Sequence, residues 1–301
     1  AGTFVHDYIE GVYKNEKDKQ QFSHQFNEKM IENEFLGIEF PNEQIRDGFI
    51  ADVKHYTEHF KLLDGKHLLE KLIVFEIEPD IWIQGYVDMI QVTENKDINV
   101  IDWKTSSKFS GKQKLLDAGR QLVMYKVGLE SNPNVKVSSV KWCMLKYIYV
   151  CHIQKNKKVK RKMCSRRKWV KEMKSTFEKE MLSNGMDDLL VSLEIDEAIK
   201  NNNIDNLPDY IKDKFWLEDC YVEYEVDDDK INELKGYINR TINEIESLNK
   251  EDESQWTPVN IEDNSFYCNH LCNHRESCKF LKEYKKQLSN KTEVKLDDLF
   301  K

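Results

Sequence analysis

The chain has 301 residues and a formal net charge of −8, which results from 46 Lys and Arg against 54 Asp and Glu. Hydrophobic residues make up 40% and aromatic residues 11%, which excludes a disordered chain and allows a substantial core. The sequence has no apolar run long enough to span a bilayer and no signal peptide, so we expect a soluble, cytoplasmic protein without membrane contact.

Hydrophobic spacing predicts helices before and after a group of strands. Apolar residues predict one or two helices within 3–35 and another from residue 42 or 43 to about 63. Short turns separate three strand-like segments and predict an antiparallel meander of 67–78, 81–92 and 98–104. The remaining predicted elements, in chain order, are a helix at 112–130, a strand at 136–150 that continues into a basic hairpin ending near 164, and helices at 166–183 and 228–249. Residues 184–226 have no clear period.

Two acidic residues lie on neighbouring predicted strands. Asp88 ends the apolar segment that begins at Ile81, and Asp102 and Lys104 are two residues apart on the next strand, so their side chains share one face. Antiparallel pairing would place Asp88 beside Asp102, and two carboxylates that close repel each other unless a cation lies between them. Oxygen ligands suit Mg²⁺ or Mn²⁺, and a nearby lysine can act on water or on a phosphate. The pattern therefore indicates metal-dependent hydrolysis of a phosphodiester.

An Asp-x-Lys pair is weak support by itself, because such pairs are common on solvent-facing strands. Here Ile98, Val100 and Ile101 make the strand a buried one. Charges are rare on buried strands unless they are paired or bind a metal.

The same residues carry a resemblance to a known family. Asp88 and the Asp102-Trp103-Lys104-Thr105 strand resemble the PD-(D/E)XK nuclease superfamily, and within it the RecB-like and CRISPR-associated adaptation-nuclease branch. Three further motifs are similar: Gly2-x-x-x-His6, Glu70 ahead of the first strand, and Gln121-x-x-x-Tyr125 on a helix. The resemblance covers roughly residues 1–150 and the cysteine-rich segment. It implies an α/β, restriction-endonuclease-like core, in which helices flank a mixed central sheet, with an N-terminal helical arm and a C-terminal Cys-rich segment.

The resemblance also implies roles for these residues. Asp88 and Asp102 would bind the metal with the backbone carbonyl of Trp103, and His6 and Glu70 would complete the metal shell. Lys104 would activate water or stabilise charge on the phosphate, while Gln121 and Tyr125 would position the substrate or Lys104. Two other acids, Glu76 and Glu78, are alternatives to Glu70.

Three cysteines lie close together near the C terminus, at Cys268, Cys272 and Cys278. RecB-like members often bind a [4Fe–4S] cluster through one cysteine before the G-x-x-x-H helix and three near the C terminus, usually as C-x2-C-x5-C. Here the first gap is x3, and an upstream cysteine would precede Ala1, so three thiolates leave a four-ligand cluster incomplete. A Cys3His zinc site with His270 or His274 and a metal-free packing role are the alternatives.

A basic stripe at residues 155–174 interrupts the acidic sequence. It holds eleven Lys and Arg and one acid, Glu172. Such a stripe predicts nucleic-acid contact, although many charge runs are only solvated surface. The residues expected to bind nucleic acid are Lys157, Lys158, Lys160, Arg161, Lys162, Arg166, Arg167 and Lys168. The tail at 293–301 resembles a sliding-clamp-binding motif in which Glu293 replaces the usual Gln, and docking of the tail on its own domain is the alternative.

The resemblance implies a divalent-metal-dependent DNA nuclease, an exonuclease on single-stranded DNA or duplex ends in recombination, repair or replication. Its partners would be DNA and a clamp or helicase. The alternatives are a catalytically silent DNA-binding scaffold of a helicase-recombination complex, a structure-specific endonuclease and an RNA nuclease. The Lys- and Asn-rich composition suggests a bacterial or phage-infected cell. We expect four parts: an N-terminal helical part at 1–65, the nuclease core at 66–183, a helical insert or support at 184–256, and a Cys-rich segment and tail at 257–301.

Overall fold

The structure is a computed structural model that describes residues 1–38, 40–109, 111–154, 156–249, 251–252, 255 and 259–297, with side chains through residue 289. The chain forms two compact units, one of residues 1–39 and 44–236 and the other of residues 40–43 and 237–301. Within the described ranges, no helix is both long and apolar enough to cross a membrane.

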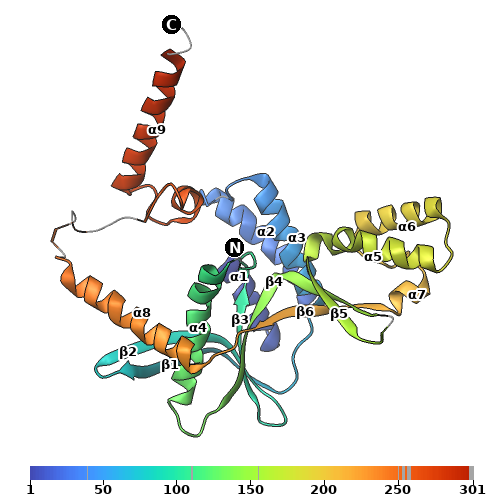
Figure 1. Cartoon of the computed structure of the whole chain (residues 1–301), viewed down its shortest axis with the longest axis horizontal. Helices are drawn as coiled ribbons and strands as arrows, with labels where there is room; N and C mark the ends of the chain where they lie inside the picture. The colour runs from blue at the N-terminus through green and yellow to red at the C-terminus, as the bar shows by residue number, and fades with distance from the viewer. Residues whose placement is uncertain are drawn as a thin grey trace. The chain divides into compact units, whose positions relative to one another are not determined.

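A mixed sheet, six-stranded over the described residues, forms the centre of the first unit (Figure 1). The strand order is β1-β2-β3-β4-β5, and β6 pairs with β4. Strands β3 and β4 are parallel, whereas the other paired strands are antiparallel. The strands are β1 Lys66–Glu78, β2 Ile81–Val92, β3 Ile98–Lys104, β4 Val137–Ile153, β5 Val159–Ser165 and β6 Phe215–Glu223.

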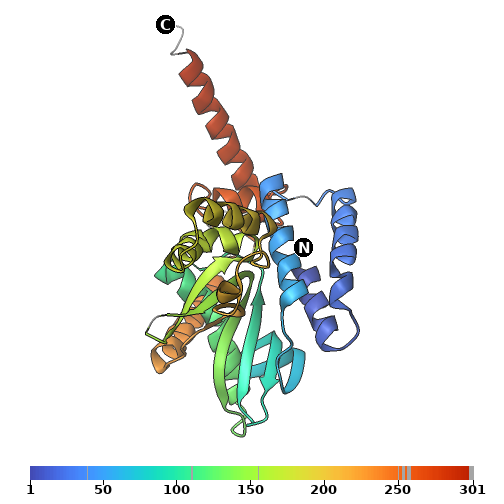
Figure 2. The same cartoon turned by 90° about the vertical axis from the view of Figure 1, so that its right-hand side faces the viewer.

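Helices lie on both faces of this sheet (Figure 2). The Tyr13 ring at the end of α1 stacks on Trp103 with 6.2 Å between centroids, whereas Gln121 of α4 accepts a hydrogen bond from Lys104. Because Trp103 and Lys104 are neighbours on β3, their side chains point to opposite faces, and α1 and α4 therefore cover opposite sides. Helix α4 also supplies the crossover that the parallel strands β3 and β4 require.

The helices of the described residues are α1 Gly2–Tyr13, α2 Phe22–Phe35, α3 Glu43–His59, α4 Lys112–Glu130, α5 Trp169–Ser183, α6 Asp188–Asn201, α7 Asp209–Lys212, α8 Asp228–Ser247 and α9 Lys279–Asp297. Among the described residues, Lys19–Gln21 and Arg166–Lys168 form 3₁₀ turns, and Tyr267–Leu271 form a π-helical turn. This last turn and α9 belong to the second unit.

Large aromatic side chains fill the interior of the first unit. Trp103, Trp142 and Tyr56 are fully buried around the sheet. A second cluster, which includes Trp169 and Phe177, packs α5, α6 and α7 against the sheet. Burial of each such side chain contributes about 2 to 3 kcal/mol, so the core can offset unfavourable groups placed at a functional site.

The predicted meander is confirmed, and the predicted segments 81–92, 98–104 and 112–130 match β2, β3 and α4 residue for residue. Two placements are wrong. Glu70 lies inside β1 rather than ahead of it, because Lys66–Leu69 already pair with Met89–Val92. Asp88 lies within β2 rather than at its end, since both the predicted range 81–92 and the observed strand continue to Val92.

The segment without a clear period, 184–226, contains α6, α7 and β6. Strand β6 pairs with β4, so part of the region expected to be a helical insert contributes to the central sheet. The sequence of β6, FWLEDCYVE, lacks the apolar–polar alternation of a half-buried strand, which explains why it was not predicted.

Candidate active site

The predicted carboxylates meet where β2 and β3 separate. The ladder between these strands runs from the pair Val92–Ile98 to the pair Met89–Ile101 and would next join Asp88 to Asp102. Instead, the Asp88 Oδ2 atom accepts a hydrogen bond of 2.7 Å from the main-chain N–H of Trp103. A side chain thus replaces the next ladder bond, and the two acids lie at the point of divergence.

Both acids are removed from solvent. Only 1% of the Asp102 side chain is exposed, and its Oδ2 lies 2.7 Å from the Lys104 Nζ atom. Burial, partly opposed by Lys104 and reinforced by Asp88, raises the pKa of Asp102 to about 6. Burial also raises the pKa of Asp88, against the lowering effects of the Trp103 N–H and of Lys104. The pair therefore resists full ionisation until positive charge is added.

A chain of hydrogen bonds holds Lys104 on the α4 side. Lys104 Nζ donates to Gln121 Oε1 at 2.8 Å, Gln121 Nε2 donates to the Tyr125 hydroxyl at 2.6 Å, and that hydroxyl donates to the Tyr86 carbonyl at 2.7 Å. Because Gln121 and Tyr125 are four residues apart, both reach the sheet from one face of α4. The Tyr86 carbonyl is on β2, two residues before Asp88, so the chain ties the lysine to the strand of the other acid.

Helix α1 brings His6 to the other side of the pair. The His6 Nδ1 atom lies 3.6 Å from Asp88 Oδ2, and its ring meets Trp103 edge-on. Burial is the main cause that lowers the pKa of His6, so the imidazole is neutral at pH 7. Gly2 permits this approach, because a Cβ there would lie 3.1 Å from Thr105 Oγ1 at the end of β3.

Glu70 faces this site from a strained position. It stands between the pairs Leu69–Met89 and Lys71–Val87, opposite Asp88, and its φ of 46° is in the left-handed region. Burial and then the charge of Asp88 raise the pKa of Glu70, with further effects from Glu10 and Asp7 of α1. Sequence reasoning missed Asp7 and Glu10, although their spacing of one and four residues from His6 is a signal that could have found them.

The donor types fit a divalent cation. Two buried carboxylates with raised pKa values gain from added positive charge, and a neutral imidazole is the form of histidine that binds metals. Among the described residues, however, no three His, Cys, Asp or Glu side chains are arranged as a ready metal site. The Lys104 ammonium is the cation paired with Asp102 in this arrangement.

The cysteine-rich segment does not form the expected metal centre. Cys268 is buried, Cys272 and Cys278 are partly exposed, and the described part of this segment has no group of three His, Cys, Asp or Glu that could hold a metal. Cys278 Sγ instead accepts a weak hydrogen bond from the Leu281 N–H in the first turn of α9. The arrangement thus supports neither an iron–sulfur cluster nor zinc. The predicted clamp-binding tail at 293–301 lies outside the residues whose side chains are described.

The side chains of the basic stripe differ in how far they are exposed to solvent. The expectation for Arg166 is wrong, because its side chain is fully buried, pairs with Asp219 at 2.5 Å and lies over the Tyr56 ring. Arg167 is partly engaged, since its Nε lies 3.9 Å from Asp52. The remaining predicted residues keep largely exposed side chains on the β4–β5 hairpin and the turn after it: Lys157, Lys158, Lys160, Arg161, Lys162 and Lys168.

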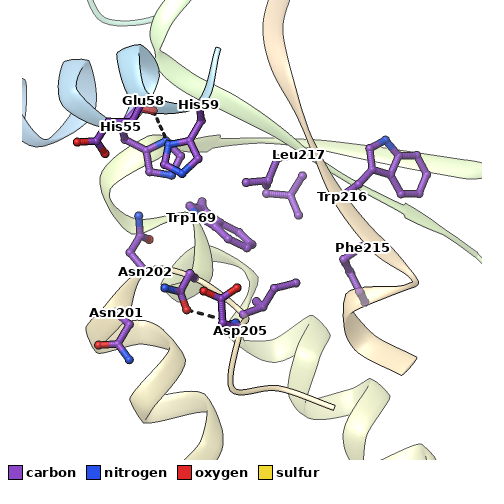
Figure 3. Close-up of a pocket in the computed structure, with 13 residues that line it drawn as sticks. His55, Glu58, His59, Trp169, Asn201, Asn202, Asp205, Phe215, Trp216 and Leu217 are labelled. Atoms are coloured by element: carbon purple, nitrogen blue, oxygen red, sulfur yellow. Dashed lines mark hydrogen bonds between the residues drawn. The ribbon is translucent and has the colours of Figure 1, made fainter. Parts of the chain in front are cut away.

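Figure 3 shows a separate pocket of about 390 Å³ in the first unit. Its lining comes from α3, β4, the start of α5, the end of α6 with the loop after it, and β6, and includes His55, His59 and Trp169. Burial is the main cause that lowers the pKa of His55 to about 3, so this lining histidine is neutral. The lining contains none of the residues of the carboxylate site.

The sheet topology and the acid pair at a strand divergence define an α/β core of the restriction-endonuclease-like class. A family model described as the PD-(D/E)XK nuclease superfamily matches residues 1–279. The chain belongs to the PD-(D/E)XK nuclease superfamily, whose members are generally hydrolases of nucleic acids. No curated protein and no solved structure matches the chain.

Proposed function

We propose that the chain is a divalent-metal-dependent DNA nuclease, and that it acts as an exonuclease on single-stranded DNA or duplex ends in recombination, repair or replication. The observation that carries the proposal is the buried Asp88 and Asp102 pair beside a lysine held by Gln121 and Tyr125. The Gln-x-x-x-Tyr bonds and the approach of His6 also favour the RecB-like branch within the superfamily.

Asp88 and Asp102 would hold Mg²⁺ or Mn²⁺, and His6 and Glu70 would complete or extend the ligand set. The ion would supply a Lewis acid that lowers the pKa of water and offsets charge on the phosphate. Addition of positive charge would also favour the ionised form of both acids, whose pKa values burial raises.

Lys104 would orient the attacking water or donate to a phosphate oxygen as negative charge develops there. Its Nζ already donates to Gln121, so the ammonium is positioned before the substrate arrives. Water would add to phosphorus in line with the departing oxygen. The products would be one phosphate monoester and one hydroxyl end, with the proton of water passing to the leaving oxygen.

The test is degradation of end-labelled linear DNA, single- and double-stranded, with Mg²⁺ or Mn²⁺ and with a circular DNA control. We expect metal-dependent loss of linear DNA, intact circles, and loss of activity in Lys104→Ala. Lys212→Ala, which removes an exposed lysine at 2.9 Å from Asp209 and outside the carboxylate site and the basic stripe, is the matched control and should retain cleavage. Cleavage of circles would indicate an endonuclease, and DNA binding without cleavage would indicate a silent scaffold.

A further inference from the structure

Large apolar side chains lie exposed on one face of the β1–β2 hairpin. Trp82 is 64% exposed, Tyr86 59%, Val74 55% and Leu72 44%. Leu72 pairs directly with Tyr86, and Val74 pairs with Gln84, the residue between the two aromatic positions on the same face. Residues opposite each other in an antiparallel pair share a face, so the four side chains form one apolar stripe.

This stripe leads to the acid pair. Trp82, Tyr86 and Asp88 alternate with other residues along β2 and so share the same side of that strand. At a rise of about 3.4 Å per residue, Tyr86 lies about 7 Å and Trp82 about 20 Å from Asp88 along the strand. The Tyr86 main chain is also fixed, because its carbonyl accepts the hydrogen bond from Tyr125.

The chemistry of the stripe fits bases better than phosphates. Two exposed aromatic rings and two aliphatic side chains provide flat apolar contacts but no cation. The nearby Glu76 is already engaged, since its Oε1 accepts a hydrogen bond from the Asp80 N–H in the hairpin turn. Every nucleobase has a π-face, so stacking on aromatic rings binds single strands with little sequence preference.

We propose that the Trp82–Tyr86 stripe is a base-stacking platform that guides an unpaired nucleic-acid strand to Asp88. The inference rests on the proposed function, because it assigns the strand to the substrate of that site. Bases inside a duplex are already stacked on one another, so the platform would act on single strands or on frayed ends. It would thereby make single-stranded substrate the preferred class.

The experiment measures binding of a labelled single-stranded oligonucleotide in chelator, where cleavage does not interfere. A second oligonucleotide of the same length, with abasic sites throughout its central part, keeps the phosphates but removes bases. We expect Trp82→Ala and Tyr86→Ala each to weaken binding of the normal strand by about tenfold, and to leave binding of the abasic strand nearly unchanged. The base-containing strand should also quench tryptophan fluorescence of the wild type more than that of Trp82→Ala.

Phe35→Ala is the matched control, because Phe35 is an aromatic residue of α2 with 93% exposure. It should bind both oligonucleotides as the wild type does. Equal losses for normal and abasic strands, or unchanged binding by both platform variants, would overturn the platform. Cleavage by the wild type is measured in parallel with Mg²⁺ or Mn²⁺. Base-dependent binding without cleavage would refute the nuclease proposal and leave the platform standing.

Discussion

Replacement of Asp102 by Asn is expected to stabilise the folded protein at pH 8 when divalent cations are absent. The carboxyl is 1% exposed, and its pKa is raised from 3.8 to about 6, chiefly by burial. The folded state therefore binds this proton more tightly than the unfolded state does. At a pH well above 6, ionisation of the buried group costs about 3 kcal/mol of stability. Asn has the same shape without the charge.

This cost is already net of the ion pair with Lys104, because that lysine opposes the rise in the pKa of Asp102. We therefore expect Asp102→Asn to raise the free energy of unfolding by about 3 kcal/mol at pH 8. The gain should shrink as the pH falls through 6 and vanish below about 4, where both states bind the proton.

Urea unfolding from pH 4 to pH 8, with chelator and with Mg²⁺, measures this gain. Mg²⁺ should stabilise the wild type and close the gap, because added positive charge favours the ionised pair, whereas Asp102→Asn should respond little. Asp52→Asn is the matched control, because Asp52 is also buried with a raised pKa but accepts bonds from the Arg167 N–H and the Ser165 hydroxyl. A gap that is absent at pH 8, or equal at pH 4 and pH 8, would refute the reasoning.

Three further predictions concern other groups. Tyr125→Phe removes the hydroxyl that holds Gln121, and we expect kcat/KM on DNA to fall about tenfold with little change in melting temperature; an unchanged kcat/KM would contradict the positioning role. Arg166→Met leaves Asp219 unpaired and should destabilise the fold by about 3 to 5 kcal/mol in urea unfolding, and a loss of DNA affinity without destabilisation would argue against its structural role. Burial keeps the pKa of His55 near 3, so the contribution of His55 to stability is present above pH 6.5 and is lost as the pH falls toward 3. His55→Gln should therefore flatten the pH dependence of the unfolding free energy between pH 6.5 and 3. An unaltered slope would rule out His55 as a source of that pH dependence.

Sequence patterns predicted the helices and strands correctly where the local sequence favours the same structure as the tertiary contacts. Strands β2 and β3 carry strong β-forming residues bounded by turns, and α4 has apolar residues on one face up to the turn at Asn132-Pro133, so their ranges could be predicted. The same alternation rule placed Asp102 and Lys104 on one face, and the observed ion pair agrees with that prediction.

The patterns failed where pairing partners decide the structure. The residues before Glu70 could be assigned to the first strand from the sequence. Only the pairing of residues on both sides of Glu70 with β2 shows that Glu70 lies inside one continuous strand. Strand β4 is long enough to pair with β3, β5 and β6, and the sequence of β6 does not reveal that β4 is its partner. Likewise, a run of basic residues cannot show that Arg166 turns inward to Asp219 while its neighbours face solvent.

The candidate site is also where the chain departs most from the rules that its core obeys. Glu70 has a left-handed φ of 46° within a strand, a conformation that costs about 1 to 3 kcal/mol for a residue with a side chain. Asp88, which lies opposite Glu70, does not continue the ladder with β3 and instead accepts a side-chain hydrogen bond from the Trp103 N–H. Asp102 is buried, and its pKa is raised. Elsewhere in this sheet, the buried side chains are mostly apolar. Because a fold selected only for stability would remove such features, their concentration at one strand divergence supports a functional role there on physical grounds that are independent of any motif.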